Sequence, residues 1–157
     1  MTAQIAEVLH MNGEVHRLCA HPLGPYFELA GIMSPFDDFR CTALRRGYVG
    51  TWEITQGRLY LIGLKGWRAG SDDDCGMETL FPGFPERVFA HWFTGELRIP
   101  QGGLLEYQHM GYRSRYERDL FITVRDGVIA SERVQVNGVA APDARTGYRV
   151  AAATFHG

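Results

Sequence analysis

Apolar and polar residues alternate most clearly between residues 47 and 67, where the sequence is GYVGTWEITQGRLYLIGLKGW. Alternation places successive side chains on opposite faces of a strand, and the Gln-Gly pair at 56–57 favours a tight turn between two strands. The segment therefore predicts a β-hairpin with Trp52 as a core anchor on its apolar face. A two-residue turn predicts the cross-strand pairs Ile54–Leu59, Trp52–Leu61 and Gly50–Gly63. A three-residue turn would shift this register, and the sequence alone leaves both open.

An aromatic-rich stretch, residues 86–123, is the centre of the predicted fold because it holds 7 of the 19 aromatic residues. Its two apolar runs, 88–99 and 104–110, are separated by Pro-Gln-Gly-Gly at 100–103, a composition typical of turns. We therefore predict two antiparallel strands joined by that turn. Large aromatic side chains fall on both faces of the first strand, which predicts a central place in the sheet. Gly95, near its middle, indicates a bulge or a close backbone approach.

The N-terminal residues carry two competing patterns. Apolar residues at 5, 8 and 9 have helical spacing, whereas Asn-Gly at 12–13 is a strong hairpin signal. We favour a strand pair formed by residues 8–11 and 14–18.

A similar hairpin is predicted near the C-terminus, where Asp-Gly at 126–127 separates residues 120–124 from 128–136. Residues 148–155 form one more predicted strand. The segments 20–40 and 68–86 are rich in Pro, Gly and polar residues and should be irregular. The chain 1–157 is thus expected to be a single domain, a mainly antiparallel β-sandwich or open barrel built from successive hairpins with little helix.

Bulk composition is that of an ordinary globular protein, with 45% hydrophobic and 22% charged residues. A formal net charge of −2 argues against general binding to nucleic acid or to an anionic membrane, since both need a concentrated basic surface. Of the 16 basic residues only Lys65 is a lysine. The bias towards arginine fits either a surface made for bidentate carboxylate or phosphate contacts or the base composition of a genome.

Three widely spaced cysteines, Cys19, Cys41 and Cys75, form no CxxC pair and indicate reduced thiols. The first residues lack the pattern of a signal peptide. We therefore expect a soluble protein of the cytoplasm, bacterial in style.

Motifs for phosphate binding, dinucleotide binding and serine hydrolysis are absent from the sequence. The three aspartates at 72–74 lack the spacing of a calcium loop and are expected to be solvated. His16, Cys19 and His21 lie close enough in sequence for a Cys–His nucleophile or a metal site, but a buried thiol is the preferred interpretation. No metal and no cofactor are expected.

The best candidate for a binding site is the polar and aromatic segment 112–119. Tyr and Arg are enriched at the energetic centres of protein interfaces because they combine contact area with polar reach. A structural crossover with mutually neutralised surface charges is the equally weighted alternative. The candidate binding residues are Trp92, Tyr107, His109, Tyr112, Arg113, Arg115, Tyr116 and Glu117.

A catalytic site is the weaker interpretation of the same region. His91, His109 and Glu117 could exchange protons in a pocket, although the predicted register does not require the two histidines to touch. Hydrogen-bonded core or interface histidines are the preferred alternative. The aromatic walls of such a pocket would be Trp52, Trp92, Tyr107 and Tyr116.

We therefore expect a non-enzymatic cytoplasmic protein-interaction module, such as an immunity or antitoxin-like partner that blocks another protein. The alternative is a small-molecule-binding protein or enzyme that uses His91, His109 and Glu117. A third hypothesis is an oligomeric subunit whose exposed strand pairs with a second copy. A concave pocket would favour the second hypothesis, an exposed Tyr and Arg patch the first, and an apolar patch or free sheet edge the third.

Overall fold

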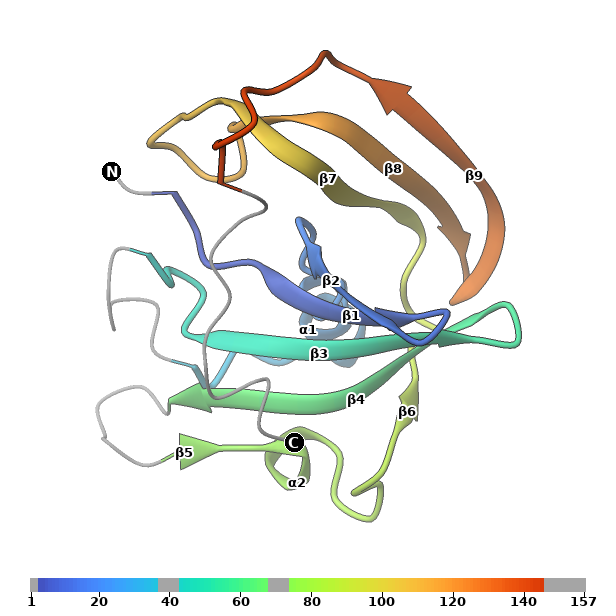
Figure 1. Cartoon of the computed structure of the whole chain (residues 1–157). Helices are drawn as coiled ribbons and strands as arrows, with labels where there is room; N and C mark the ends of the chain where they lie inside the picture. Colours follow the sequence, from blue (N-terminus) through green and yellow to red (C-terminus); the bar gives the residue numbers. More distant parts are fainter. Residues whose placement is uncertain (1–2, 37–42, 68–73, 146–157) are drawn as a thin grey trace.

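The computed structural model describes residues 3–36, 43–67 and 74–145. They form one mixed β-sheet that does not close on itself, with the strand order β2-β1-β3-β4-β9-β8-β7, and the short strands β5 and β6 pair with β4 (Figure 1). The protein is therefore mainly β, as the hydrophobic pattern predicts. The strands are β1 (Glu7–Met11), β2 (Glu14–Leu18), β3 (Tyr48–Thr55), β4 (Arg58–Trp67), β5 (Asp74–Cys75), β6 (Val88–Phe89), β7 (Gly95–Glu106), β8 (Arg115–Arg125) and β9 (Val128–Val136).

The N-terminal hairpin β1–β2 forms around the predicted Asn-Gly turn, with φ of 54° at Asn12 and 77° at Gly13. However, β1 also pairs with β3 in parallel, with Leu9 beside Trp52. A mainly antiparallel sheet was expected, and this parallel pair makes the observed sheet mixed. Parallel pairing needs a long connection, and residues 19–47 between β2 and β3 supply it.

The β3–β4 hairpin confirms the predicted two-residue turn at 56–57 and the pairs Trp52–Leu61 and Ile54–Leu59. The predicted pair Gly50–Gly63 is wrong, because a register shift between Thr51 and Trp52 places Gly50 opposite Leu64. Gly50 makes room for the side chain of Glu7. A Cβ at this position would lie 2.6 Å from a carboxylate oxygen of Glu7, so only glycine lets that carboxylate approach the backbone.

Strand β7 overturns the predicted central hairpin, since the chain does not reverse at 100–103. It continues as one strand, with Pro100 opposite Asp119 and Leu104 opposite Tyr116, and register shifts absorb the Gly-Gly pair. Gly102 has a φ of 83°, the conformation of a bulge. β7 lies at the end of the strand path, so the predicted central position in the sheet is wrong. An edge strand tolerates a proline such as Pro100, because one row of its N–H groups has no strand partner.

The β8–β9 hairpin forms around the predicted Asp-Gly turn at 126–127. β8 begins at Arg115, earlier than predicted, so much of the expected crossing 112–119 is strand.

Two short helices occupy segments that were predicted to be irregular, α1 (Gly24–Ala30) and α2 (Met77–Leu80). In α1, Pro25 lies in the first turn, where its missing N–H costs nothing, and Gly31 ends the helix with a φ of 68°. Neither helix is long and apolar enough to cross a membrane. The predicted strand 148–155, Cys41 and the aspartates at 72–73 lie outside the described residues.

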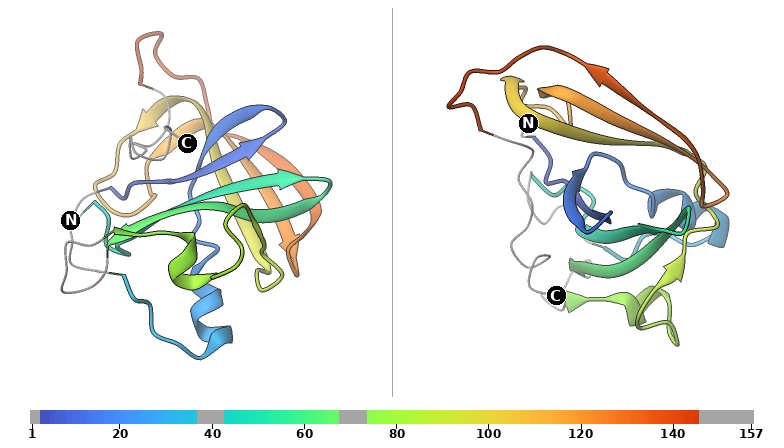
Figure 2. Two further views of the ribbon diagram at one scale, coloured as in Figure 1. Left: turned by 90° about the horizontal axis from the view of Figure 1, so that it is seen from below. Right: turned by 45° about the vertical axis from the view of Figure 1, so that its right-hand side comes forward.

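The core lies between two parts of the strongly curved sheet. In Figure 2, β7, β8 and β9 lie over β1, β3 and β4. The parts meet where β4 pairs with β9 at Arg58–Val128, and again where the Cys19 amide donates to the Arg98 carbonyl of β7 at 2.9 Å. Side chains from both parts form one buried cluster, including Leu9, Trp52, Leu59, Leu61, Leu97, Ile99, Leu120 and Ile122.

Candidate functional site

The two predicted catalytic histidines lie at opposite ends of β7. His91 precedes the strand and its ring lies 5.5 Å from the ring of Trp92, whereas His109 follows the strand and its ring lies 4.7 Å from that of Tyr107. The twelve-residue strand β7, bulged near its middle, separates them. The structure therefore does not bring His91 and His109 into one site.

Tyr112 and Tyr116, two of the predicted binding residues, face the interior. Tyr116 is fully buried. The Tyr112 hydroxyl donates to the carbonyl of Ile5 at 3.0 Å and lies 2.6 Å from Nε2 of His21. Burial raises the pKa of Tyr112 and lowers the pKa of His21 to about 3, so both are neutral at physiological pH. These side chains join the N-terminal segment to the start of β8.

Glu117 anchors a loop. One carboxylate oxygen accepts the amide of Gly103 at 2.7 Å and the other accepts the amide of Ala140 at 3.1 Å, and these two hydrogen bonds hold its pKa below the ordinary value. The nearby Arg113 and Arg115 are exposed on the surface. Only a loose contact of 3.9 Å joins Arg115 to Glu106.

The four aromatic residues expected to wall a pocket do not gather. Trp52 is fully buried in the core. Trp92 stacks on Phe81 and its indole N–H donates to the carbonyl of Pro22 at 2.8 Å. Tyr107 is exposed at the far end of β7.

A buried ion pair between Glu7 and Arg46 was not foreseen from the sequence. One Glu7 oxygen accepts the Trp52 indole N–H at 3.0 Å, and the other accepts the Gly50 amide at 2.8 Å and Nη2 of Arg46 at 2.7 Å. Burial works against the charge of Arg46, yet the Glu7 carboxylate holds its pKa above the ordinary value. A glutamate that interrupts the apolar run of β1 was the available signal. The pair fixes the N-terminal strand to β3.

The possible Cys–His site around Cys19 lacks a reactive thiolate. Burial raises the pKa of the Cys19 thiol to about 12. Within the described residues, no three His, Cys, Asp or Glu side chains come together as a metal-binding group. Cys19 is partly buried and packs beside Ala6 and Tyr116 as a small apolar residue.

Strand β9 is the most exposed element of the sheet. Every residue except Ile129 is exposed, and the exposed fraction reaches 57% at Val134 and 73% at Val136. β9 pairs with β8 along its whole length but meets β4 at Arg58–Val128 alone. Beyond Ile129, no other described element runs alongside the far edge of β9 in Figures 1 and 2.

The hydrogen-bonding pattern shows which groups of β9 face that edge. The Asn137 amide donates to the Glu117 carbonyl at 2.7 Å, so residues 117 and 137 form a hydrogen-bonded pair. Along antiparallel strands, hydrogen-bonded pairs alternate with pairs that are not hydrogen-bonded. The register with β8 then points the N–H and C=O groups of residues 132, 134 and 136 away from β8. We call this row the β9 free edge.

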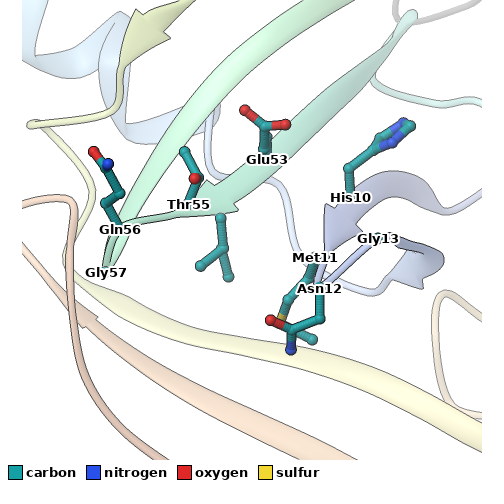
Figure 3. A pocket seen from close by; sticks show the side chains of 9 residues that line it. His10, Met11, Asn12, Gly13, Glu53, Thr55, Gln56 and Gly57 are labelled. Atoms are coloured by element: carbon teal, nitrogen blue, oxygen red, sulfur yellow. The ribbon is translucent and has the colours of Figure 1, made fainter.

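A polar hollow lies between two hairpin turns (Figure 3). Since β1 and β3 are parallel, the turns at 12–13 and 56–57 lie at the same end of the sheet. The volume is about 480 Å3. His10 and Glu53 point to one side of it and Asn12 to the other, as Figure 3 shows.

Comparisons of the chain with models of protein families, with curated proteins and with solved structures find no match.

Proposed function

We propose that the protein is a non-enzymatic binding module that takes an extended segment of another polypeptide onto the β9 free edge. The observation that carries this proposal is the pair of exposed valines, Val134 and Val136, on a strand whose outer N–H and C=O groups have no strand partner in the described part of the chain. Such an edge is a template for strand addition, in which main-chain hydrogen bonds supply affinity and alternate side chains supply specificity.

The chemistry of the edge suits a strand rather than a flat surface. Residues 132, 134 and 136 present backbone groups to an incoming strand, and their side chains share one face of the sheet. Natural proteins usually blunt an exposed edge with Lys, Pro or a covering loop. Arg133 belongs to the other face, where it stacks on Phe121 at 4.2 Å and so leaves the valines uncovered.

Three further features belong to the same proposal. The curved sheet acts as an open barrel, supported by the hydrogen bond from Cys19 to Arg98 near the ends of the strand path. The setting is the cytoplasm, supported by the free thiol of Cys19. An immunity-like or antitoxin-like role is one form that such strand capture would take. The wide separation of His91 from His109 supports binding over catalysis.

The experiment is a selection of linear peptides from a random display library on the immobilised protein, followed by affinity measurements by calorimetry. Val134→Pro removes one N–H from the free edge and leaves the hydrogen bonds to β8 intact, whereas Val134→Thr keeps that N–H and is the matched control. Selected peptides should bind the wild type and Val134→Thr, and should lose at least about tenfold in affinity for Val134→Pro.

Amide hydrogen exchange then locates the bound peptide. The amides of residues 132, 134 and 136 should gain protection. The proposal fails if no peptide is selected, if the selected peptides bind Val134→Pro as tightly as wild type, or if protection appears elsewhere. If Val134→Pro does not fold, as judged by circular dichroism, Val136→Pro provides the same test nearer the strand end.

The hollow of Figure 3 supports a second candidate, a small polar ligand. Its 480 Å3 lies within the range of roughly 300–1,000 Å3 for ligand sites. Its walls are mainly polar turn residues, whereas such sites are usually apolar and aromatic, so this candidate ranks second. Glu53→Gln and His10→Ala should abolish any ligand-induced rise in melting temperature if the hollow is the site.

A further inference from the structure

Two exposed arginines lie over two neighbouring aromatic rings on the outer face of β4 and β6. The Arg87 guanidinium lies 4.2 Å from the ring centre of Tyr60, and that of Arg58 lies 5.4 Å from the ring centre of Phe89. The two rings are themselves 5.7 Å apart, because Tyr60 on β4 is the register partner of Phe89 on β6. Stacking of this kind fixes long side chains that would otherwise sample many rotamers.

A third arginine belongs to the same surface. Val128, which is 45% exposed, is the register partner of Arg58 on one side and of Arg125 on the other, so the three side chains share one face. Phe89 packs against the adjoining turn, since a Cβ on Gly127 would lie 2.8 Å from its ring. We define the arginine–aromatic surface as Arg58, Tyr60, Arg87, Phe89, Arg125 and Val128.

The three arginines of this surface form no ion pair within the described residues. Other arginines do, as Arg46 pairs with Glu7 at 2.7 Å and Arg98 with Asp119 at 2.8 Å. Acidic residues occur nearby, namely Glu53 opposite Tyr60, Glu86 beside Arg87, and Asp126, which bonds to Thr94. None of them neutralises an arginine of the surface directly.

We propose that the arginine–aromatic surface docks a carboxylate-rich segment of a protein partner. The guanidinium group matches a carboxylate with two parallel hydrogen bonds, and arginine beside an aromatic ring is the composition of interface hot spots. Because the rings already order Arg58 and Arg87, binding loses less side-chain entropy. Charge complementarity therefore defines the partner as acidic.

A nucleic acid fits this surface less well. Bases bind proteins by stacking on open aromatic faces, but Tyr60 is only 8% exposed and guanidinium groups lie over both rings. The whole chain has a formal net charge of −2, whereas phosphate backbones need a continuous basic surface.

The surface is independent of the β9 free edge, although the two adjoin at Val128. Binding to the edge uses backbone groups of residues 132, 134 and 136, while binding to the surface uses side chains of β4, β8 and the segment that contains β6. Val134→Pro alters only the β9 free edge, whereas replacing Arg58, Arg87 and Arg125 by alanine alters only the arginine–aromatic surface. Failure of one proposal therefore does not decide the other.

The test is an NMR titration with a synthetic oligoglutamate peptide, in which the arginine Nε–H resonances report contact. The resonances of Arg58, Arg87 and Arg125 should shift at about 0.05 M salt and lose most of the shift at about 0.5 M, because exposed charges are screened. Replacing these three arginines by alanine should reduce affinity at least about tenfold.

The matched control replaces Arg113, Arg115 and Arg118, three exposed arginines elsewhere, by alanine and changes the net charge equally. It should stay within about twofold of the wild type, since the contacts are specific. If both triple variants lost affinity for the peptide equally, binding would depend on net charge alone and the proposal would be overturned. Tighter binding of a single-stranded oligonucleotide at the same residues, or unchanged affinity of the Arg58, Arg87 and Arg125 triple variant, would also overturn it.

Discussion

Replacing Glu7 by glutamine is the sharpest test of how the buried ion pair stabilises the fold. The substitution keeps size and removes charge, so the Arg46 guanidinium, whose side chain is only 9% exposed, loses its counter-ion. Breaking a buried pair by removing one partner costs about 3–5 kcal/mol. The glutamine NH2 group would also face donors, because Gly50 and Trp52 both donate to the carboxylate. We therefore expect the free energy of unfolding to fall by about 3–5 kcal/mol, a large share of the stability of a typical domain.

The assay is urea unfolding followed by tryptophan fluorescence, with Arg46→Lys as the control. Lysine keeps the positive charge but loses the fork that reaches both Glu7 and the carbonyl of Ile5, so a smaller loss of about 1–2 kcal/mol is expected. A loss below about 1 kcal/mol for Glu7→Gln would refute the reasoning, because it would mean that water solvates the pair. If Glu7→Gln does not fold, the expected decrease in the free energy of unfolding of Arg46→Lys remains the test.

Three other outcomes are expected. Trp52→Ala should lower the free energy of unfolding by about 3–5 kcal/mol, as for a large core side chain, and a loss below about 1 kcal/mol in denaturant unfolding would contradict its placement. Folding lowers the pKa of His21 from 6.5 to about 3. Between pH 6.5 and about 3, His21 is therefore protonated in the unfolded chain but neutral in the folded protein. Stability should thus fall by up to about 1.4 kcal/mol per pH unit as pH drops below about 6.5, and His21→Gln should remove that slope. Cys19 should resist iodoacetamide at mildly alkaline pH until urea unfolds the chain, as mass spectrometry of its peptide would reveal.

Features that the sequence predicts well are those decided by neighbouring residues. The β3–β4 turn at 56–57 and the β8–β9 turn at 126–127 need positive φ, and each sequence supplies a glycine at the second position. Alternating apolar residues then fix which face is buried. Trp52 is buried for this reason.

Features that depend on contacts between residues far apart in the chain could not be predicted from the local sequence. The Pro-Gln-Gly-Gly sequence at 100–103 has the composition of a turn, but β8 runs alongside it and holds it as a bulged strand. Tyr112 and Tyr116 looked like interface residues because their type is common there. Tyr112 donates to the carbonyl of Ile5 and Tyr116 packs against Ala6, so both face the interior because of contacts with a distant part of the chain.

The arginine–aromatic surface shows the same limit. Arginine-rich composition is plain in the sequence, but Arg58, Arg87 and Arg125 are far apart along the chain. They come together because β4 pairs with both β6 and β9. Candidate sites chosen as one continuous segment miss such an arrangement.

The meeting of β4 and β9 at Arg58–Val128 also bears on how the molecule opens. Two backbone hydrogen bonds, Leu59 to Gly127 at 2.9 Å and Ile129 to Gly57 at 2.8 Å, join the strands there, whereas β7 and β8 pair over most of their length. Few backbone hydrogen bonds therefore join β2-β1-β3-β4 to β9-β8-β7, and the buried cluster that includes Leu9, Trp52, Leu97 and Ile122 supplies most of the connection between them. Parts that share one core open together, because separating them exposes the apolar side chains of both. The two parts of the sheet should therefore unfold as one cooperative unit, with the core rather than the β4–β9 contact setting the barrier.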